Sequence, residues 1–274
     1  MKLDLHARTD VGLVRPQNED AFSVWTPEPP DSEFFAKALV AVADGMGGHP
    51  GGDIASALAV QAASRVALGG ILPPPREALC ELFNKAAMAI AHRGQNDPSL
   101  KEMGTTLTTA VLSRGLAHVA HIGDSRLYWV RGTDFLQVTR DHNVAQELVL
   151  SGRLEAEVAE DHPMANVLTR CLGVCPDGAP DLLEGALALA AGDMLLLATD
   201  GLAKAVHTQT VIELLQGVTA EQATAQLVEA ALSGGAPDNV TVLVVRVLEL
   251  GNPNPEPPRT FRFDEPQSSW HWVR

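Results

Sequence analysis

The chain has 274 residues, of which 46% are hydrophobic, 20% charged and 4% aromatic, as in an ordinary globular protein with a substantial core. Its formal net charge is -14, with 34 acidic residues against 20 Lys and Arg, and such a surface disfavours nucleic acids and anionic membranes as partners. No apolar stretch reaches the ~18 residues that a membrane-spanning helix needs, and the first residues lack the apolar segment of a signal peptide. We therefore expect a cytoplasmic protein.

The chain contains three cysteines, Cys80, Cys171 and Cys175. An odd number in a chain of this length does not indicate a disulfide framework, and it fits a reducing compartment. Cys171 and Cys175 also lack the second ligand pair that a zinc site needs. We therefore expect free or buried thiols at all three positions.

Apolar patterning in the first half of the chain predicts strands and helices in close succession. Residues 3–9 alternate apolar and polar side chains, and residues 37–43 form a short apolar run that a turn at Asp44-Gly45 ends. A Gly-rich stretch then leads into a helix that Asp53 is expected to cap and that runs through Val66. The other elements expected here are a helix at 76–95 and strands at 105–112, 116–122, 126–130 and 135–138, the last two forming a hairpin.

The second half begins with an irregular segment, residues 141–180, whose polar breaks predict short helical pieces in a mobile excursion. Adjacent strands followed by helices and then strands favour an α+β fold with antiparallel sheets over a doubly wound sheet. The elements expected after the excursion are a strand at 194–198, helices at 208–216 and 219–233, and a strand at 240–247.

Residues 250–274 are rich in proline and polar side chains, and we expect a C-terminal tail there, outside a single domain at residues 1–249. Two interpretations of the tail's aromatic residues stay open: they pack back on the domain, or they dock onto a partner. These residues are Phe261, Phe263, Trp270 and Trp272.

Acidic residues recur at the ends of the predicted buried strands. A single Asp-Gly after a strand is usually only a turn. Several acids at strand ends predict a functional site instead, because strand ends are rigid mounts for side chains. The acids are Asp44, Asp124, Asp200 and Asp238 at strand ends, with Glu19 and Asp20 near the first strand.

Carboxylates that converge in this way repel one another unless a cation neutralises them. The acidic motifs contain no lysine, so the sequence predicts a metal, and oxygen ligands favour Mg²⁺ or Mn²⁺ over zinc. Two such ions activate water for attack on phosphorus. Arg15, four residues before Glu19, is the candidate that binds the phosphoryl oxygens through its bidentate fork. The residues alone therefore predict two-metal hydrolysis of a phosphoester.

Six short motifs stand in order along the chain. They are Arg15-Pro16-Gln17-Asn18-Glu19-Asp20, Asp44-Gly45-Met46-Gly47-Gly48-His49, Gly104-Thr105-Thr106, Gly123-Asp124-Ser125-Arg126, Thr199-Asp200-Gly201 and Pro237-Asp238-Asn239-Val240-Thr241. In this order they resemble the motifs of the PPM family of metal-dependent serine/threonine protein phosphatases, also called type 2C. The similarity is closest to the bacterial branch and covers roughly residues 3–248.

The resemblance implies an α-β-β-α four-layer sandwich, in which two antiparallel sheets are flanked by helix pairs. It implies two divalent ions, Mn²⁺ or Mg²⁺, that Asp44 would bridge, with the Gly45 carbonyl on one and Asp200 and Asp238 on the other. The remaining roles that it implies are water-mediated contact by Glu19, orientation of the site by Asp20, a third and weaker metal at Asp124, and phosphate binding by Arg15.

The implied activity is hydrolysis of phosphoserine and phosphothreonine in proteins by metal-activated water, without a phosphoenzyme intermediate. Such a monomeric enzyme would act in bacterial signalling by reversing a Ser/Thr kinase. The eukaryotic branch often has a general-acid histidine where this chain has Met46, which cannot donate a proton, so the acid stays open. Residues 141–180 would form a flap at the cleft, where His162 either contacts the substrate or is an exposed loop histidine.

Two other functions stay open. A catalytically inactive relative would act as a binding module for phosphoproteins, although the intact set of Arg15, Asp44, Asp200 and Asp238 argues against it. A two-metal nuclease is disfavoured by the acidic charge balance and by the lack of a basic stripe with interleaved aromatic residues.

Overall fold

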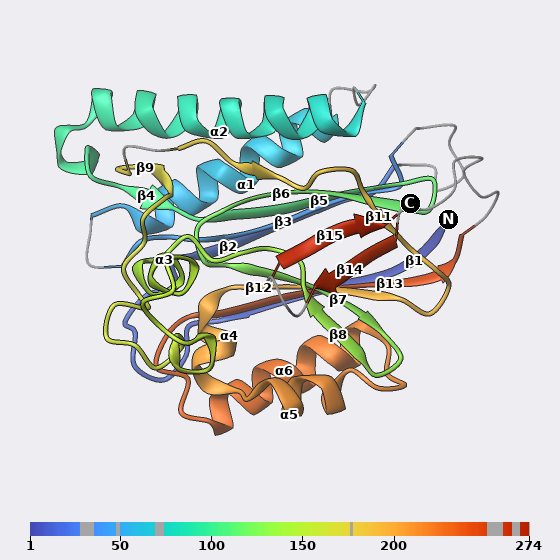
Figure 1. Cartoon of the computed structure of the whole chain (residues 1–274). Helices are drawn as coiled ribbons and strands as arrows, with labels where there is room; N and C mark the ends of the chain where they lie inside the picture. Colours follow the sequence, from blue (N-terminus) through green and yellow to red (C-terminus); the bar gives the residue numbers. More distant parts are fainter. Residues whose placement is uncertain are drawn as a thin grey trace.

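The computed structural model describes residues 1–27, 36–47, 50–68, 74–175, 178–250, 260–264 and 269–273. Within these ranges two antiparallel sheets stack on each other between two groups of helices (Figure 1). The predicted α+β, four-layer α-β-β-α fold is therefore confirmed. The helices over one sheet are α1 (Gly52–Leu68) and α2 (Pro75–Asn96), and those over the other are α4 (Asp200–Ala205), α5 (Thr208–Leu214) and α6 (Ala220–Ser233).

The first sheet places the two ends of the domain side by side. Its strands, in spatial order, are β1 (Lys2–Asp10), β13 (Val240–Glu249), β12 (Met194–Ala198), β7 (Arg126–Arg131) and β8 (Asp134–Gln137). β1 pairs with β13 so that Asp10 lies opposite Val240. Residues that follow β1 therefore lie next to residues that precede β13, although more than half of the sequence separates them.

The second sheet contains a strand that the sequence did not predict. Its order is β10 (Asp181–Leu182), β6 (Leu116–Ile122), β5 (Leu107–Ser113), β3 (Ala38–Asp44) and β2 (Asp20–Trp25), with β11 (Leu187–Ala188) also paired with β6. Besides the two-residue strands β10 and β11, which were not predicted either, β2 was missed because both of its faces carry apolar side chains. Phe22 and Val24 are exposed, whereas Ser23 is buried and hydrogen-bonded to Ser64 (2.8 Å between hydroxyl oxygens). Ala21 and Trp25 pack against the core on the same face as Ser23, so apolar residues on both faces hide the period of two in the sequence.

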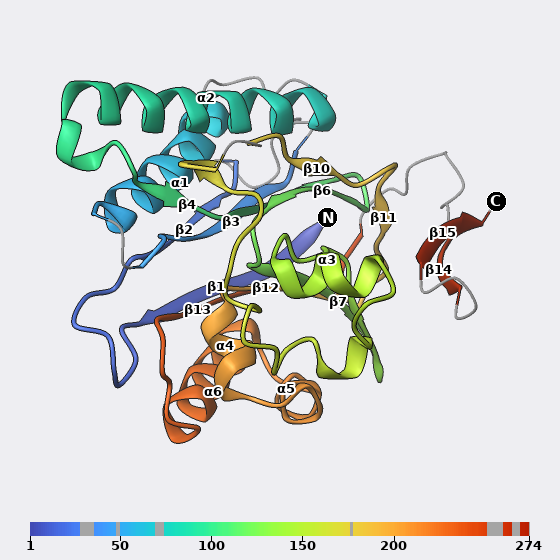
Figure 2. The same ribbon diagram turned by 60° about the vertical axis from the view of Figure 1, so that its left-hand side comes forward.

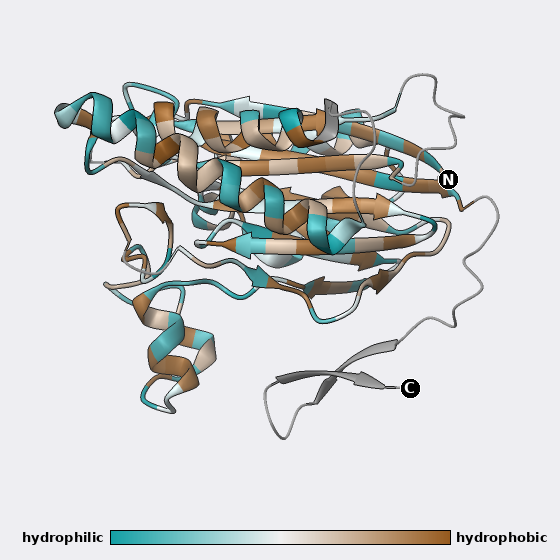
Figure 3. Cartoon of the chain, turned by 90° about the horizontal axis from the view of Figure 1, so that it is seen from above, coloured by the Kyte–Doolittle hydropathy of each residue, from teal (hydrophilic) through white to brown (hydrophobic). Residues whose placement is uncertain are grey.

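Three apolar clusters hold the layers together. One lies between α1, α2 and the second sheet, another lies between α4–α6 and the first sheet, and the third fills the space between the sheets. The third cluster includes Val40 and Ala110 from one sheet and Leu197 and Leu243 from the other. The strands are accordingly mostly hydrophobic, while the helices carry both kinds of side chain (Figure 3). Burial of this area is the main contribution to stability.

The segment expected to form a flap, residues 141–180, lies between β8 and β10 (Figure 2). It contains the helix α3 (Val144–Leu150), a 3₁₀ turn at Ala156–Val158, and a short strand β9 (Leu172–Gly173) that pairs with β4 (Gly104–Thr105). Asn143 caps α3, since its side-chain oxygen accepts a hydrogen bond of 2.9 Å from the backbone N–H of Gln146. The short helical pieces expected in this segment are therefore confirmed.

The prediction of free or buried thiols was wrong for two of the three cysteines. Cys171 and Cys175 form a disulfide, while Cys80 is free. β9 lies between the two cysteines, and Gly173 adopts a left-handed backbone (φ 102°) there. This turn brings their Cα atoms to 5.3 Å, within the range that a disulfide needs, and sequence spacing alone does not predict such a turn. The cysteine count consequently gives no support to a reducing compartment.

Two further differences concern single elements. Asp53 does not precede α1 but lies in its first turn, because the helix begins at Gly52. Thr260–Asp264 (β14) and Ser269–Val273 (β15) of the expected tail pair as a hairpin, in whose register Phe261 lies opposite Trp272 and Phe263 opposite Trp270. In the part of the chain that the structure describes, no helix is both long and apolar enough to cross a membrane.

Candidate metal centre

Five aspartates converge at one edge of the two sheets. Asp44 ends β3, and in the β2–β3 register it lies opposite Asp20. Asp200 follows β12, Asp238 precedes β13, and Asp124 follows β6. Burial raises the pKa of Asp44 well above its ordinary value, and the negative charges of the other four aspartates raise it further. The structure therefore brings together the acids that the sequence placed at strand ends.

Asp20 and Asp200 each have one buried carboxylate oxygen atom that accepts no hydrogen bond from the described residues. Burial raises the pKa of Asp20 to about 7, although hydrogen bonds from Thr241 and Thr199 oppose the shift. Thr199 Oγ1 donates to Asp20 Oδ2 at 2.8 Å. Among the described residues, Oδ1 of Asp20 and Oδ1 of Asp200 are buried and have no hydrogen-bond partner. Such atoms are costly unless something compensates them, and a cation would do so.

The pKa values of Asp124 and Glu19 are also raised. Burial raises the pKa of Asp124 well above its ordinary value, and the charge of Asp200 is the next largest cause. Burial also raises the pKa of Glu19, and the nearby charge of Asp53 adds to the shift. Asp53 is thus an acid beside the site that the sequence analysis had treated as a helix cap. An acid in the first turn of α1 was the signal that could have identified it.

Two glycines next to the aspartates are required by close backbone contacts. A Cβ atom on Gly45 would lie 2.2 Å from the carbonyl oxygen of Gly52 and 2.7 Å from that of Glu19. A Cβ atom on Gly201 would lie 1.9 Å from the carbonyl oxygen of Asn239. The Asp-Gly pairs therefore reflect tight packing of loops around the carboxylates rather than simple turns.

Polar side chains quoted in the motifs hold these loops in place. Thr106 Oγ1 accepts a hydrogen bond of 2.9 Å from the backbone N–H of Asp44. Asn239 Oδ1 accepts one of 2.9 Å from the backbone N–H of Glu19, while its amide donates to the carbonyls of Val11 (2.8 Å) and Gln17 (3.0 Å). Asn239 therefore fixes the segment that carries Arg15 and Glu19 against the start of β13. Sequence reasoning gave these two residues no role.

Arg15 binds Asp238 with two nitrogen atoms. Its Nε lies 2.9 Å from Oδ1, and its Nη2 donates to Oδ2 at 2.9 Å. Burial acts against the charge of Arg15, but Asp238 outweighs it and the pKa of Arg15 is raised. The guanidinium is partly exposed, at 38% of its side chain. It therefore stands at the edge of the acid cluster, where a phosphate in solution can reach it.

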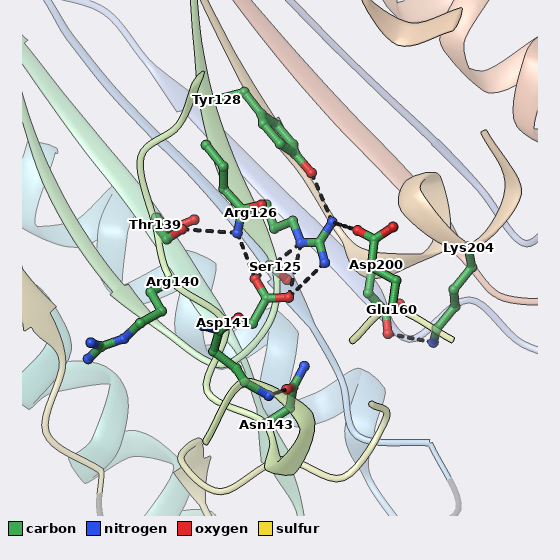
Figure 4. Close-up of polar contacts among 12 residues, drawn as sticks. Ser125, Arg126, Tyr128, Thr139, Arg140, Asp141, Asn143, Glu160, Asp200 and Lys204 are labelled. Carbon is green, nitrogen blue, oxygen red and sulfur yellow. Dashed lines mark hydrogen bonds and ion pairs between the residues drawn. The ribbon is translucent and has the colours of Figure 1, made fainter. Parts of the chain in front are cut away.

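Lys204 is the cation that sequence reasoning missed. It lies one helical turn after Asp200 on α4, where its ammonium contacts Asp200 Oδ2 (Figure 4). It also donates to Asp238 Oδ2 at 2.9 Å. The inference of a metal from the absence of lysine in the motifs was therefore based on a wrong premise. The i, i+4 spacing from Asp200 would have revealed Lys204, but α4 itself was not predicted.

The flap is anchored to β7 beside this cluster. Arg126 donates to Asp141 at the start of the flap (2.8 Å from Nη2 to Oδ2) and to Glu160 within it (2.6 Å from Nη1 to Oε1). Figure 4 shows Arg126 between these two acids. The hydrogen bonds described for His162 are local: its backbone N–H donates to Ala159, its Nδ1 accepts from the backbone N–H of Met164, and its carbonyl accepts from that of Ala165. Its contact with substrate stays a prediction.

The donor set fits hard divalent ions, since it consists of carboxylates, backbone carbonyls and two unpaired buried oxygen atoms. In the described part of the chain, however, no three or more His, Cys, Asp and Glu side chains form a ready metal-binding group. Arg15 and Lys204 instead occupy oxygen atoms of Asp238. Metal binding would therefore require these cations to release that carboxylate. Gly48 and His49 of the second motif lie outside the described residues.

This chain is similar in sequence to a known family of proteins. Residues 17–232 match the family model described as "Protein phosphatase 2C". The chain is 37% identical over 247 residues to the serine/threonine protein phosphatase PstP of Mycobacterium tuberculosis, covering 89% of this chain and 45% of PstP. It is 32% identical over 251 residues to the protein phosphatase PhpP of Streptococcus pneumoniae, covering 90% of this chain and 98% of PhpP.

A solved structure of similar fold contains metal. The catalytic domain of PstP in complex with two manganese ions matches with a TM-score of 0.77 and 36% identity, covering 90% of this chain and 99% of that one. The present chain spans less than half the length, 45%, of the PstP sequences that it matches.

Proposed function

This chain belongs to the protein phosphatase 2C family, and we propose that it hydrolyses phosphoserine and phosphothreonine in proteins with the help of two divalent ions, Mn²⁺ or Mg²⁺. The observation that carries the proposal is the convergence of Asp44, Asp200 and Asp238 beside Arg15 at one edge of the sheets. The manganese ions in the PstP structure support the choice of metal.

The ligands of the two ions would come from strand ends and one backbone carbonyl. Asp44 would bridge them, with the carbonyl of Gly45 on one ion and Asp200 and Asp238 on the other. Bound ions of this kind supply Lewis acidity and activate water for attack on phosphorus. The proposed outer contacts are Glu19 through water, Asp20 as an orienting group held by Thr199, and Asp124 with Asp200 at a third, weaker ion.

Arg15 would bind the phosphoryl group of the substrate. Its fork already holds the two oxygen atoms of Asp238, which is the geometry with which a guanidinium binds a phosphate. Released from Asp238, it would orient the phosphorus toward the acid cluster. Met46 cannot supply the proton for the leaving group, since a thioether is no donor; its backbone N–H is used by the carbonyl of Gly104 (2.9 Å).

The substrates would be proteins that a Ser/Thr kinase has phosphorylated, and the enzyme would act in bacterial signalling. The names of PstP and PhpP, both bacterial protein phosphatases, support this proposal. We propose that the chain acts as a monomer, with residues 1–249 as the phosphatase domain and the flap at 141–180 beside the cleft.

The test is metal-dependent hydrolysis of phosphoserine, phosphothreonine and phosphotyrosine peptides. We expect Mn²⁺ to stimulate release of phosphate from the first two, and Asp44→Asn to abolish it. Asp134→Asn is the matched control, because Asp134 is exposed in the β7–β8 hairpin. No hydrolysis by the wild type with any divalent ion would contradict the proposal and favour a binding module. Nicking of plasmid DNA would favour a nuclease.

A further inference from the structure

Lys204 connects two of the proposed metal ligands. Its ammonium contacts Oδ2 of Asp200 and donates to Oδ2 of Asp238 at 2.9 Å. Both carboxylates are mostly buried, with side chains that are 18% and 15% exposed, and Lys204 itself is 26% exposed. An ion pair in such surroundings is weakly screened by solvent.

Other lysines of the chain make ion pairs of a different kind. Lys101 lies 3.8 Å from Glu102, and its side chain is 69% exposed. Lys85 pairs with Glu81 one turn away on α2, where both side chains are about half exposed. Each of these pairs contains one carboxylate on the surface, where an ion pair contributes little. Lys204 instead lies where two buried carboxylates meet.

Lys204 and a divalent ion would use the same oxygen atoms. Oδ2 of Asp238 accepts hydrogen bonds from both Lys204 and Arg15, and Oδ1 already accepts from Arg15 and from the backbone N–H of Asn239 (3.0 Å). A metal that takes Asp238 as ligand must therefore displace at least one cation. If Lys204 stays nearby, its charge still repels the ion.

We propose that Lys204 is a built-in competitor of the divalent ion bound by Asp200 and Asp238, and that it lowers the affinity of this chain for that ion. The inference rests on the proposed metal-dependent function of the same site. Its physical basis is that a tethered ammonium has no translational entropy to lose on binding, so it competes at a high effective concentration. The enzyme would then need more free metal than its carboxylates alone would require.

The experiment is calorimetric titration of the metal-stripped full chain with MnCl₂. We expect Lys204→Met to lower the dissociation constant of the ion bound by Asp200 and Asp238 on the order of tenfold, because one nearby positive charge is removed. Lys204→Arg keeps the charge and should stay near the wild type. Lys101→Met is the matched control, since it removes the same charge from the exposed surface, and it should also leave the affinity unchanged.

A second measurement covers the case in which Lys204→Met is unstable without metal. Thermal unfolding at increasing Mn²⁺ should show a larger rise of Tm in Lys204→Met than in the wild type, because tighter binding stabilises the folded state by mass action. Equal or weaker Mn²⁺ binding by Lys204→Met, or an equal gain in Lys101→Met, would overturn the inference.

The outcomes also separate this inference from the proposed function. Normal phosphatase activity with unchanged affinity in Lys204→Met contradicts the inference alone. Tighter Mn²⁺ binding in Lys204→Met without hydrolysis by the wild type contradicts the phosphatase alone. Absence of Mn²⁺ binding in both proteins contradicts both.

Discussion

The two ends of β12 each carry a buried aspartate, and the two differ in how the protein compensates their charge. Asp193, before the strand, is fully satisfied: Arg131 binds both oxygen atoms (2.7 and 2.8 Å), and the indole of Trp129 (3.1 Å) and the backbone N–H of Ala190 (2.8 Å) donate to Oδ2. Asp200, after the strand, contacts Lys204 through one oxygen atom, and its other oxygen is buried and has no donor among the residues that the structure describes.

This difference separates a structural acid from a functional one. A buried carboxylate with a full set of donors ties elements together. A buried carboxylate with an unused oxygen among other acids is destabilising in the folded protein, and such strain is typical of sites that bind a ligand. The Asp193 side chain is 1% exposed and that of Asp200 18%, so Asp193 is the more deeply buried acid and is also the one with the full set of donors. The donors around each carboxylate therefore distinguish the two roles better than burial does.

The largest effect is expected at the functional end. Asp200→Asn should lower phosphatase activity by more than about a hundredfold, because the proposed ligand loses its charge. The free energy of unfolding of the metal-free protein should change by less than about 1 kcal/mol, because the amide removes repulsion as well as the contact with Lys204. Steady-state assays with Mn²⁺ and urea unfolding in EDTA measure both. A large loss of stability in Asp200→Asn would contradict the contrast between a functional Asp200 and a structural Asp193.

The opposite result is expected at the structural end. Asp193→Asn should lower the free energy of unfolding by about 3 kcal/mol, since it leaves the charge of Arg131 and several donors without a partner. Activity per folded molecule should stay at the wild-type level. Urea unfolding and a phosphopeptide assay at low temperature test this, and loss of activity in fully folded Asp193→Asn would count against a purely structural role.

Arg15 and Arg131 differ in the same way as the functional and the structural aspartate. Arg15→Met should raise the KM for a phosphopeptide by about tenfold, the value of a charge-assisted hydrogen bond to phosphate. It should have little effect on stability, because the side chain is partly exposed. Arg131→Met should lower the free energy of unfolding and leave the KM unchanged, since its partner Asp193 is buried. Equal KM values for Arg15→Met and the wild type would exclude phosphate binding by Arg15.

The smallest effect concerns pH. The folded-state pKa of Asp20, about 7, is above the ordinary value of 3.8, so the folded metal-free protein holds a proton that the unfolded chain has already released. The free energy of unfolding in EDTA should therefore fall as the pH rises from about 4 to about 7. Asp20→Asn should show a smaller fall. Urea unfolding across this pH range measures how the free energy of unfolding changes with pH in the wild type and in Asp20→Asn. Equal changes in the two proteins would show that Asp20 is ionised throughout.

Much of this site was predictable because its residues stand at strand ends. The apolar runs before Asp44 and Asp200 are strong signals of buried strands, and the glycine after each marks a close backbone approach. β2 and α4 were missed for physical reasons. β2 exposes Phe22 and Val24 and packs Ala21 and Trp25 inward, so no apolar-polar alternation is visible in its sequence. α4 has only six residues, too few for a helical period to appear.

The sequence by itself indicated an α+β fold with antiparallel sheets and the acids at strand ends, because strand periodicity is local and each acid is next to its strand. The four-layer arrangement came from the resemblance to the family. Only the tertiary structure decided which carboxylates are satisfied. Asp193 receives its donors from β7, and Asp238 receives Arg15 from the segment after β1 and Lys204 from α4. These contacts join residues far apart in the chain, so they depend on sheet order and helix placement rather than on local spacing.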